Sequence, residues 1–263
     1  KVVNALLARK EIQINQAKND GATPFFMACQ NDHVKVVNLL LDRKEIQINQ
    51  ATNNGCTPLY IACVNGHVKV INVLLVQKEI QINQADKDGA TPLFIACYED
   101  HVKVVKALLT RKEIQINQAA HIGCTPLFIA CGNDCVKVLN LLLVRKEIQI
   151  NQAMNDGRTP LFFACQEDRV KVVNVLLARK EIQINQATNN GATPLFIACA
   201  NDCVKVLNLL LARKEIQINQ AMNDGATPLL IACENDRVKI VNLLLARKEI
   251  QINQATNNGC TPL

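Results

Sequence analysis

The sequence predicts an all-α fold, an open solenoid of stacked helix pairs with a projecting finger at each repeat. The octapeptide KEIQINQA occurs eight times without change, and successive copies begin 34 residues apart, from Lys10 to Lys248. A repeat of this length cannot bury a core alone, because ordering each residue costs about 1.5 kcal/mol. Its apolar faces must be covered by the copies before and after it.

Each repeat is expected to begin with a finger turn and a short first helix. In the repeat 53–86, Gly55 suits the positive φ of a turn, Thr57 suits the N-cap, and Pro58 suits the first helical position. The apolar residues that follow predict a helix from about Pro58 to Val64. Asn65-Gly66 then offers a left-handed stop.

A second helix is expected from about His67 to Gln77, and it is apolar on almost every side. Its polar stripe is narrow, with Lys69, Asn72 and Val76 spaced along one helical face. Such a helix is sandwiched between neighbouring repeats and has one edge in water.

The segment Glu79–Gln84 alternates apolar and polar residues, which predicts an extended, strand-like arm with Ile80 and Ile82 facing inward. Together with the turn at Asn53-Asn54-Gly55, this arm is expected to form a projecting hairpin finger between helix pairs.

Composition favours a reduced, soluble array. The net charge of +6 is spread along the repeats and does not indicate a polyanionic partner. Seven of the 12 cysteines share one position, where helix spacing of about 8–10 Å exceeds the roughly 7 Å that a disulfide spans. We therefore expect thiols in a reducing, cytoplasmic compartment. The chain has no run of 18 apolar residues and no signal-peptide layout.

The pattern G-x-T-P-L-x-x-A-C-x-x-x-H-V-K-V-V-x-L-L-L resembles the ankyrin repeat, and the match extends over essentially the whole chain. The resemblance implies helix pairs with perpendicular fingers, a concave recognition side, and a family that mostly binds proteins and lacks catalytic activity. One array is expected, as a fragment of a longer chain: full repeats at 19–52, 53–86, 87–120, 121–154, 155–188, 189–222 and 223–256, with partial repeats at 1–18 and 257–263.

The histidines, cysteines and lysines give no catalytic or metal site. His33, His67 and His101 recur at one position, which favours a structural bond to backbone across the inter-helix turn over zinc, whose ligands must converge on one point. Cys131 and Cys135 lie at i, i+4 but have no second pair of ligands nearby. The lysine column at Lys35, Lys69, Lys103, Lys137, Lys171, Lys205 and Lys239 is interpreted as a solvated face, since aromatic platforms for nucleic acid are missing.

The asparagine that recurs at the end of each arm is interpreted as a structural ladder in which each amide bonds neighbouring backbone. Its members are Asn15, Asn49, Asn83, Asn117, Asn151, Asn185, Asn219 and Asn253. The chain has no Gly-rich phosphate loop, nucleophile elbow or paired-carboxylate motif. We expect no enzyme activity, no cofactor and no small-molecule substrate.

The residues that vary between repeats lie around the finger tips and the end of the first helix, which by resemblance line the concave side. A partner-binding site is expected where aromatic, apolar and arginine side chains replace the usual Asn and Asp, because such side chains dominate interface energetics. Its residues are Tyr98, Lys87, Asp88, His121, Ile122, Gly132, Asn155, Asp156, Arg158 and Gln166. The alternative is drift at unconstrained surface positions.

The function predicted is a non-enzymatic scaffold for a protein partner. The alternative is a structural array, a spacer, spring or self-associating filament element, in which repeat number is the function. A second period of 68 residues favours this alternative, since Cys135, Arg169, Cys203 and Arg237 alternate at one position, as after recent duplication. Uncapped ends would expose apolar faces for self-association.

Overall fold

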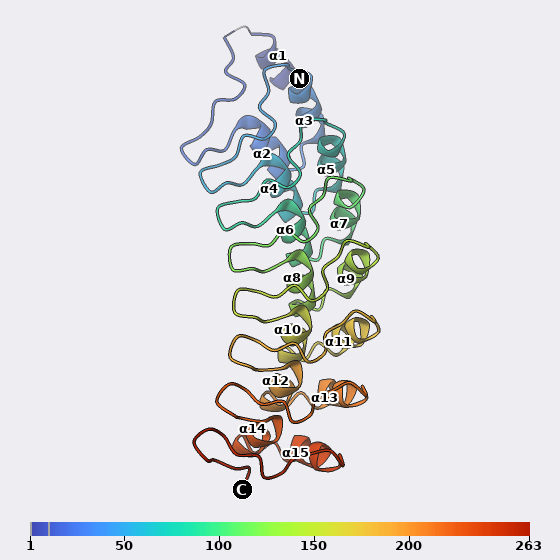
Figure 1. Ribbon diagram of the computed structural model, residues 1–263. Coiled ribbons are helices and arrows are strands. Elements are labelled where there is room, and N and C mark those ends of the chain that lie inside the picture. Colours follow the sequence, from blue (N-terminus) through green and yellow to red (C-terminus); the bar gives the residue numbers. More distant parts are fainter. Residues whose placement is uncertain (1, 10) are drawn as a thin grey trace. The chain divides into compact units, whose positions relative to one another are not determined.

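Figure 1 shows the computed structural model of the chain, in which residues 2–9 and 11–263 are described. The chain divides into two compact units. The first unit holds residues 1–121 and 140–147, and the second unit holds residues 122–139 and 148–263. The described residues form fifteen α-helices and no strand.

The helices of each unit stack in series. First helices pack on first helices, and second helices on second helices, with the fingers beside the first helices (Figure 1). The first unit contains α1 (Val2–Leu7), α2 (Pro24–Gln30), α3 (Val34–Leu41), α4 (Pro58–Val64), α5 (Val68–Leu75), α6 (Pro92–Tyr98) and α7 (Val102–Leu108). The second contains α8 (Pro126–Gly132), α10 (Pro160–Gln166), α11 (Val170–Leu177), α12 (Pro194–Ala200), α13 (Val204–Leu211), α14 (Pro228–Glu234) and α15 (Val238–Leu245), while α9 (Val136–Leu143) has residues in both.

The first helix has the predicted bounds and the predicted cap. In α4 the hydroxyl oxygen of Thr57 accepts a hydrogen bond from the Tyr60 amide at 3.1 Å, and Pro58 occupies the first turn. Thr57 is itself buried, so this bond satisfies both a helix-end amide and a hydroxyl that water does not reach.

The second helix is shorter than predicted. Helix α5 runs from Val68 to Leu75, because His67 has the non-helical ψ of 71° and Val76 is the C-cap. The predicted edge in water is confirmed: Lys69, Asn72 and the apolar Val76 are exposed, while the opposite side of the helix is buried.

A left-handed residue ends each first helix in both units. Gly66 has φ of +68°, as predicted, but the other repeats have aspartate there: Asp32, Asp100, Asp134, Asp168, Asp202 and Asp236, with φ between +50° and +58°. The amide of the next residue then bonds back to the helix, as His101 does to the Ala96 carbonyl at 3.0 Å. Aspartate can adopt this left-handed conformation because its short polar side chain can form local hydrogen bonds, but glycine adopts it at a lower cost.

The prediction of a strand-like arm is wrong. Residues 79–84 form turns, in which the Gln84 amide donates to the Gln81 carbonyl at 3.2 Å. Ile80 and Ile82 are buried as predicted, so the alternation reflects which side chains enter the core and not a ladder of paired strands. The finger is likewise a turn, closed by the Thr52 amide on the Cys56 carbonyl at 3.0 Å.

The asparagine ladder is confirmed. The Asn83 side chain donates to the Glu113 carbonyl at 2.8 Å and accepts from the Gln115 amide at 2.9 Å. We call this pair of bonds the asparagine clamp, because one side chain holds two backbone groups of the next repeat. Both bonds recur from Asn15, Asn49, Asn151, Asn185 and Asn219.

The histidine column also joins successive repeats. The Nε2 atom of His67 lies 2.9 Å from the Gln30 carbonyl oxygen, and that of His101 lies 3.0 Å from the Val64 carbonyl oxygen. The predicted structural role is therefore correct, but the partner is different: the bond reaches the first helix of the preceding repeat and does not cross the residue's own inter-helix turn.

Replacing Asn83 by alanine should lower the free energy of unfolding by about 1–3 kcal/mol, because an amide and a carbonyl of the next repeat lose their partner. Asn72→Ala is the matched control, since Asn72 is exposed on α5. Urea denaturation followed by circular dichroism measures both. Equal stability of the two variants would contradict the role of the clamp.

Replacing Asp100 by glycine should raise the free energy of unfolding by about 0.5–1 kcal/mol, because glycine has no steric penalty at φ of +53°. Asp42→Gly is the control, since Asp42 has φ of −68° and glycine there only adds freedom to the unfolded chain. Thermal denaturation of the three proteins compares them. A stability gain in both variants, or in neither, would contradict this explanation.

Candidate functional site

The residues predicted for partner binding fall into both compact units. Lys87, Asp88, Tyr98 and His121 lie in the first unit, and Ile122, Gly132, Asn155, Asp156, Arg158 and Gln166 lie in the second. Each set belongs to the surface of its own unit.

In the first unit the predicted residues are exposed at the finger tips and at the end of a first helix. Tyr98 is the last residue of α6 and its side chain is 48% exposed. The His121 amide donates to the Asp88 carbonyl at 3.0 Å, and the Lys87 amide donates to the Asn54 carbonyl at 3.0 Å. The backbone therefore joins successive fingers, while the side chains of Lys87 and Asp88 are exposed.

In the second unit Asp156 and Arg158 form an ion pair on the finger. The Arg158 Nε atom donates to Asp156 Oδ2 at 2.7 Å, and the Arg158 amide donates to Asp156 Oδ1 at 3.0 Å. Partial burial raises the pKa of Asp156, but the two hydrogen bonds from Arg158 and its positive charge together outweigh burial, so the pKa lies below its ordinary value. Ile122 is 61% exposed, and its carbonyl accepts from the Asn155 amide at 3.1 Å.

Gly132 is buried and cannot contact a partner, which corrects the prediction. A methyl group placed on Gly132 would lie 2.0 Å from the Phe163 Cε1 atom, so the Phe163 ring covers this place. Phe163 stacks on Phe128 with ring centroids 4.8 Å apart, and the Arg158 guanidinium lies 5.9 Å from its centroid. Phe163 is not among the predicted residues, although the other full repeats have isoleucine or methionine at its position.

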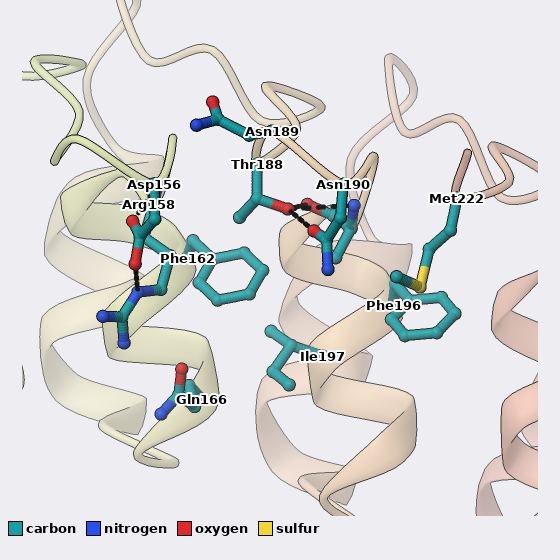
Figure 2. A pocket seen from close by; sticks show the side chains of 11 residues that line it. Asp156, Arg158, Phe162, Gln166, Thr188, Asn189, Asn190, Phe196, Ile197 and Met222 are labelled. Atoms are coloured by element: carbon teal, nitrogen blue, oxygen red, sulfur yellow. Dashed lines mark hydrogen bonds and ion pairs between the residues drawn. The ribbon is translucent and has the colours of Figure 1, made fainter. Parts of the chain in front are cut away.

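A groove of about 440 Å³ lies between the first helices and fingers of two successive repeats in the second unit (Figure 2). Phe162 on α10 and Phe196 on α12 are buried and form its apolar floor with Ala192. Ile197 and Met222 are half-buried and extend that floor.

The rim of the groove is polar. It consists of Asp156, Arg158, Gln166, Thr188, Asn189 and Asn190. Hydrogen bonds hold it in place: Thr188 Oγ1 accepts from the Ala192 amide at 3.0 Å, and the Asn189 side chain donates to the Asn155 carbonyl at 2.9 Å. Of the predicted residues, Asp156, Arg158 and Gln166 thus line the same groove.

The groove floor is not predicted from the sequence, and only part of it could be. Phe196 has a phenylalanine, tyrosine or leucine counterpart in every full repeat, so variation does not distinguish it. Met222 holds the position that Thr188 has one repeat earlier, and this change from threonine to methionine is the sequence feature that could have indicated the groove floor.

Metal-binding clusters and membrane-spanning helices are both absent from the part of the chain that the structure describes. No group of three or more His, Cys, Asp and Glu side chains is arranged to hold a metal ion among residues 2–9 and 11–263. No helix in that same part of the chain has the length and apolar character needed to cross a membrane.

Replacing Gly132 by alanine should lower the free energy of unfolding by about 1–3 kcal/mol, because the methyl group overlaps the Phe163 ring. Adding Phe163→Ile should restore most of that loss. Two repeats later the chain already has this pair, with Ala200 at the position of Gly132 and Ile231 at the position of Phe163. A double-mutant cycle in urea measures the coupling. Additive effects would contradict the proposed contact.

Comparison with known proteins agrees with this architecture. The family described as ankyrin repeats (3 copies) matches residues 1–86, 74–154 and 140–222, and the family described as ankyrin repeat matches residues 224–257. No curated protein sequence matches the chain. The family matches cover far more than half of the sequence. The chain therefore belongs to the ankyrin-repeat family.

Proposed function

We propose that this chain is a non-enzymatic scaffold that binds a protein partner on the face formed by its finger tips and first helices. Ankyrin repeats are generally protein–protein interaction modules. The groove of the second unit is the observation that carries the proposal for this chain, because an apolar floor inside a polar rim is the usual anatomy of a protein interface.

The aromatic cluster beside the groove supports the same face. Arg158 contacts both Asp156 and the Phe163 ring, so its side chain is held in one orientation before any partner arrives. A side chain that is already ordered loses little conformational entropy on binding. The predicted contact residues remain proposals on the surface of their own unit: Lys87, Asp88, Tyr98 and His121 in the first, and Ile122, Asn155 and Gln166 in the second.

A cytoplasmic location belongs to the proposal. The twelve cysteines are present as thiols, and burial raises the pKa of Cys29 to about 12 and that of Cys124 to about 11. Thiols that are rarely ionised at neutral pH are slow to oxidise, which suits a long-lived protein in a reducing compartment.

The second candidate function, a structural array, is favoured by the uniformity of the asparagine clamps. The same two bonds join repeat after repeat with nearly the same lengths. A spacer or spring with such junctions should extend in single-molecule pulling as equal steps of about 34 residues each. Electron micrographs of monodisperse single particles would count against a self-associating filament.

Ile197→Glu should weaken peptide binding at least tenfold, because a carboxylate would have to lose its water on the apolar floor. Ile61→Glu is the matched control, since Ile61 holds the same half-buried position in a repeat of the first unit. Twelve-residue peptides selected by phage display on the whole chain serve as probes, and fluorescence anisotropy measures their Kd.

Circular dichroism should show equal helicity for the two variants. Peptides that bind both variants as tightly as the original chain would contradict the proposed site, and so would an equal loss in both.

A further inference from the structure

We infer that the groove of the second unit takes an extended peptide segment with an apolar side chain on Phe196 and Ile197 and a lysine or arginine beside the carboxylates of Glu167, Asp168 and Asp202. The inference rests on the proposed function and names the chemistry of the partner.

The apolar position follows from the groove itself. Its volume of about 440 Å³ is within the range of about 300–1,000 Å³ of small-molecule pockets, so it has room for a large apolar side chain. The floor is made by Phe162, Phe196 and Ala192, with Ile197 and Met222 half-buried at its edge. A large apolar side chain would cover the exposed part of Ile197 and Met222, which water otherwise contacts.

Carboxylates lie next to the groove on the side of the inter-helix turns. Gln166 lines the groove, and its Nε2 atom donates to Glu167 Oε1 at 3.2 Å. Asp168 and Asp202 follow in the left-handed position of two successive repeats, and both are exposed. Burial first, and then the charges of Asp168, Asp202 and Glu167, raise the pKa of the Cys203 thiol to about 11. Glu167 and Asp168 directly follow Gln166 in the sequence, and Asp202 holds the position of Asp168 one repeat later, so the three carboxylates follow the ends of the two first helices that flank the groove.

The junction between repeats at the groove has a cysteine where the preceding junction has an arginine. Arg169 occupies the equivalent position one repeat earlier and donates from Nε to the Gly132 carbonyl at 2.8 Å. In the groove's own junction that position is Cys203, which is buried and carries no positive charge. The cation on the groove rim, Arg158, is already paired with Asp156.

Cys203 leaves this junction without the guanidinium that Arg169 brings to the preceding one, and a basic residue of the partner would complement Glu167 and Asp168 there. Charge complementarity raises the association rate and rejects acidic partners. The amide side chains of Gln166, Asn189 and Asn190 along the rim offer donors and acceptors to an extended peptide backbone, which a compact partner surface would use less well.

The experiment selects random twelve-residue peptides on the whole chain by phage display. The selected peptides should share an apolar residue with a lysine or arginine within a few positions of it. Their Kd is then measured with Asp168→Asn/Asp202→Asn, which keeps a side chain suited to the left-handed conformation. Asp32→Asn/Asp100→Asn is the matched control in the first unit.

We expect the second-unit double variant to bind about threefold to tenfold more weakly at low salt, with the difference largely lost at about 0.5 M salt because exposed charges are screened. The control should bind like the original chain. Selected peptides without basic residues, or with equal affinity for both double variants, would overturn this inference.

The outcome for Ile197→Glu separates the two proposals. If that variant loses binding to peptides that lack basic residues, the groove is the binding site and only the charge inference fails. If no peptide is enriched, or if enriched peptides bind Ile197→Glu normally, the proposed function fails and the inference fails with it.

Discussion

Contact between neighbouring repeats is the constraint on which the rest of the structure depends. Helices α4 and α5 have 7 and 8 residues, fewer than the roughly 12–15 that an isolated helix needs in water. They persist because first helices pack on first helices within each unit, and because the asparagine clamp, the finger backbone and residues such as His67 bond one repeat to the next. The asparagine of the clamp is the same in every repeat, and the finger bond uses backbone atoms, so these two interactions recur although the position of His67 varies.

The finger tips and first-helix ends are therefore free to vary. At the finger, one inter-repeat bond comes from the backbone, as when the Lys87 amide donates to the Asn54 carbonyl, so this bond survives a change of side chain. Where the residue is asparagine, as at Asn189, its side chain adds a second bond to the preceding finger. The second unit uses this freedom twice: Phe163 fills the space over Gly132, and Arg158 bridges the Phe163 ring and Asp156. In such a fold, binding surfaces can form at positions that are not needed for the contacts between repeats.

Local chemistry explains which features the sequence predicts. The bounds of α4, the Thr57 cap and the clamp of Asn83 follow from residue types at fixed spacing. The arm is predicted as a strand because apolar and polar residues alternate in it. The same alternation arises in turns when every second side chain, here an isoleucine, is buried in the core. Gly132 resembles a surface residue because most members of its column are not buried, and only the three-dimensional contact with Phe163 shows that it is covered. The groove floor is hidden for a similar reason, since Phe196 repeats along the chain.

Native-state hydrogen exchange at the amide of Gln115 tests the central claim most directly. Gln115 is exposed, and the hydrogen bond that its amide makes is to the Asn83 side chain of the preceding repeat. If repeats are held by their neighbours through the clamp, this amide should exchange as slowly as the buried amides of α7. Exchange at the rate of an unstructured peptide, while α7 stays protected, would contradict the account.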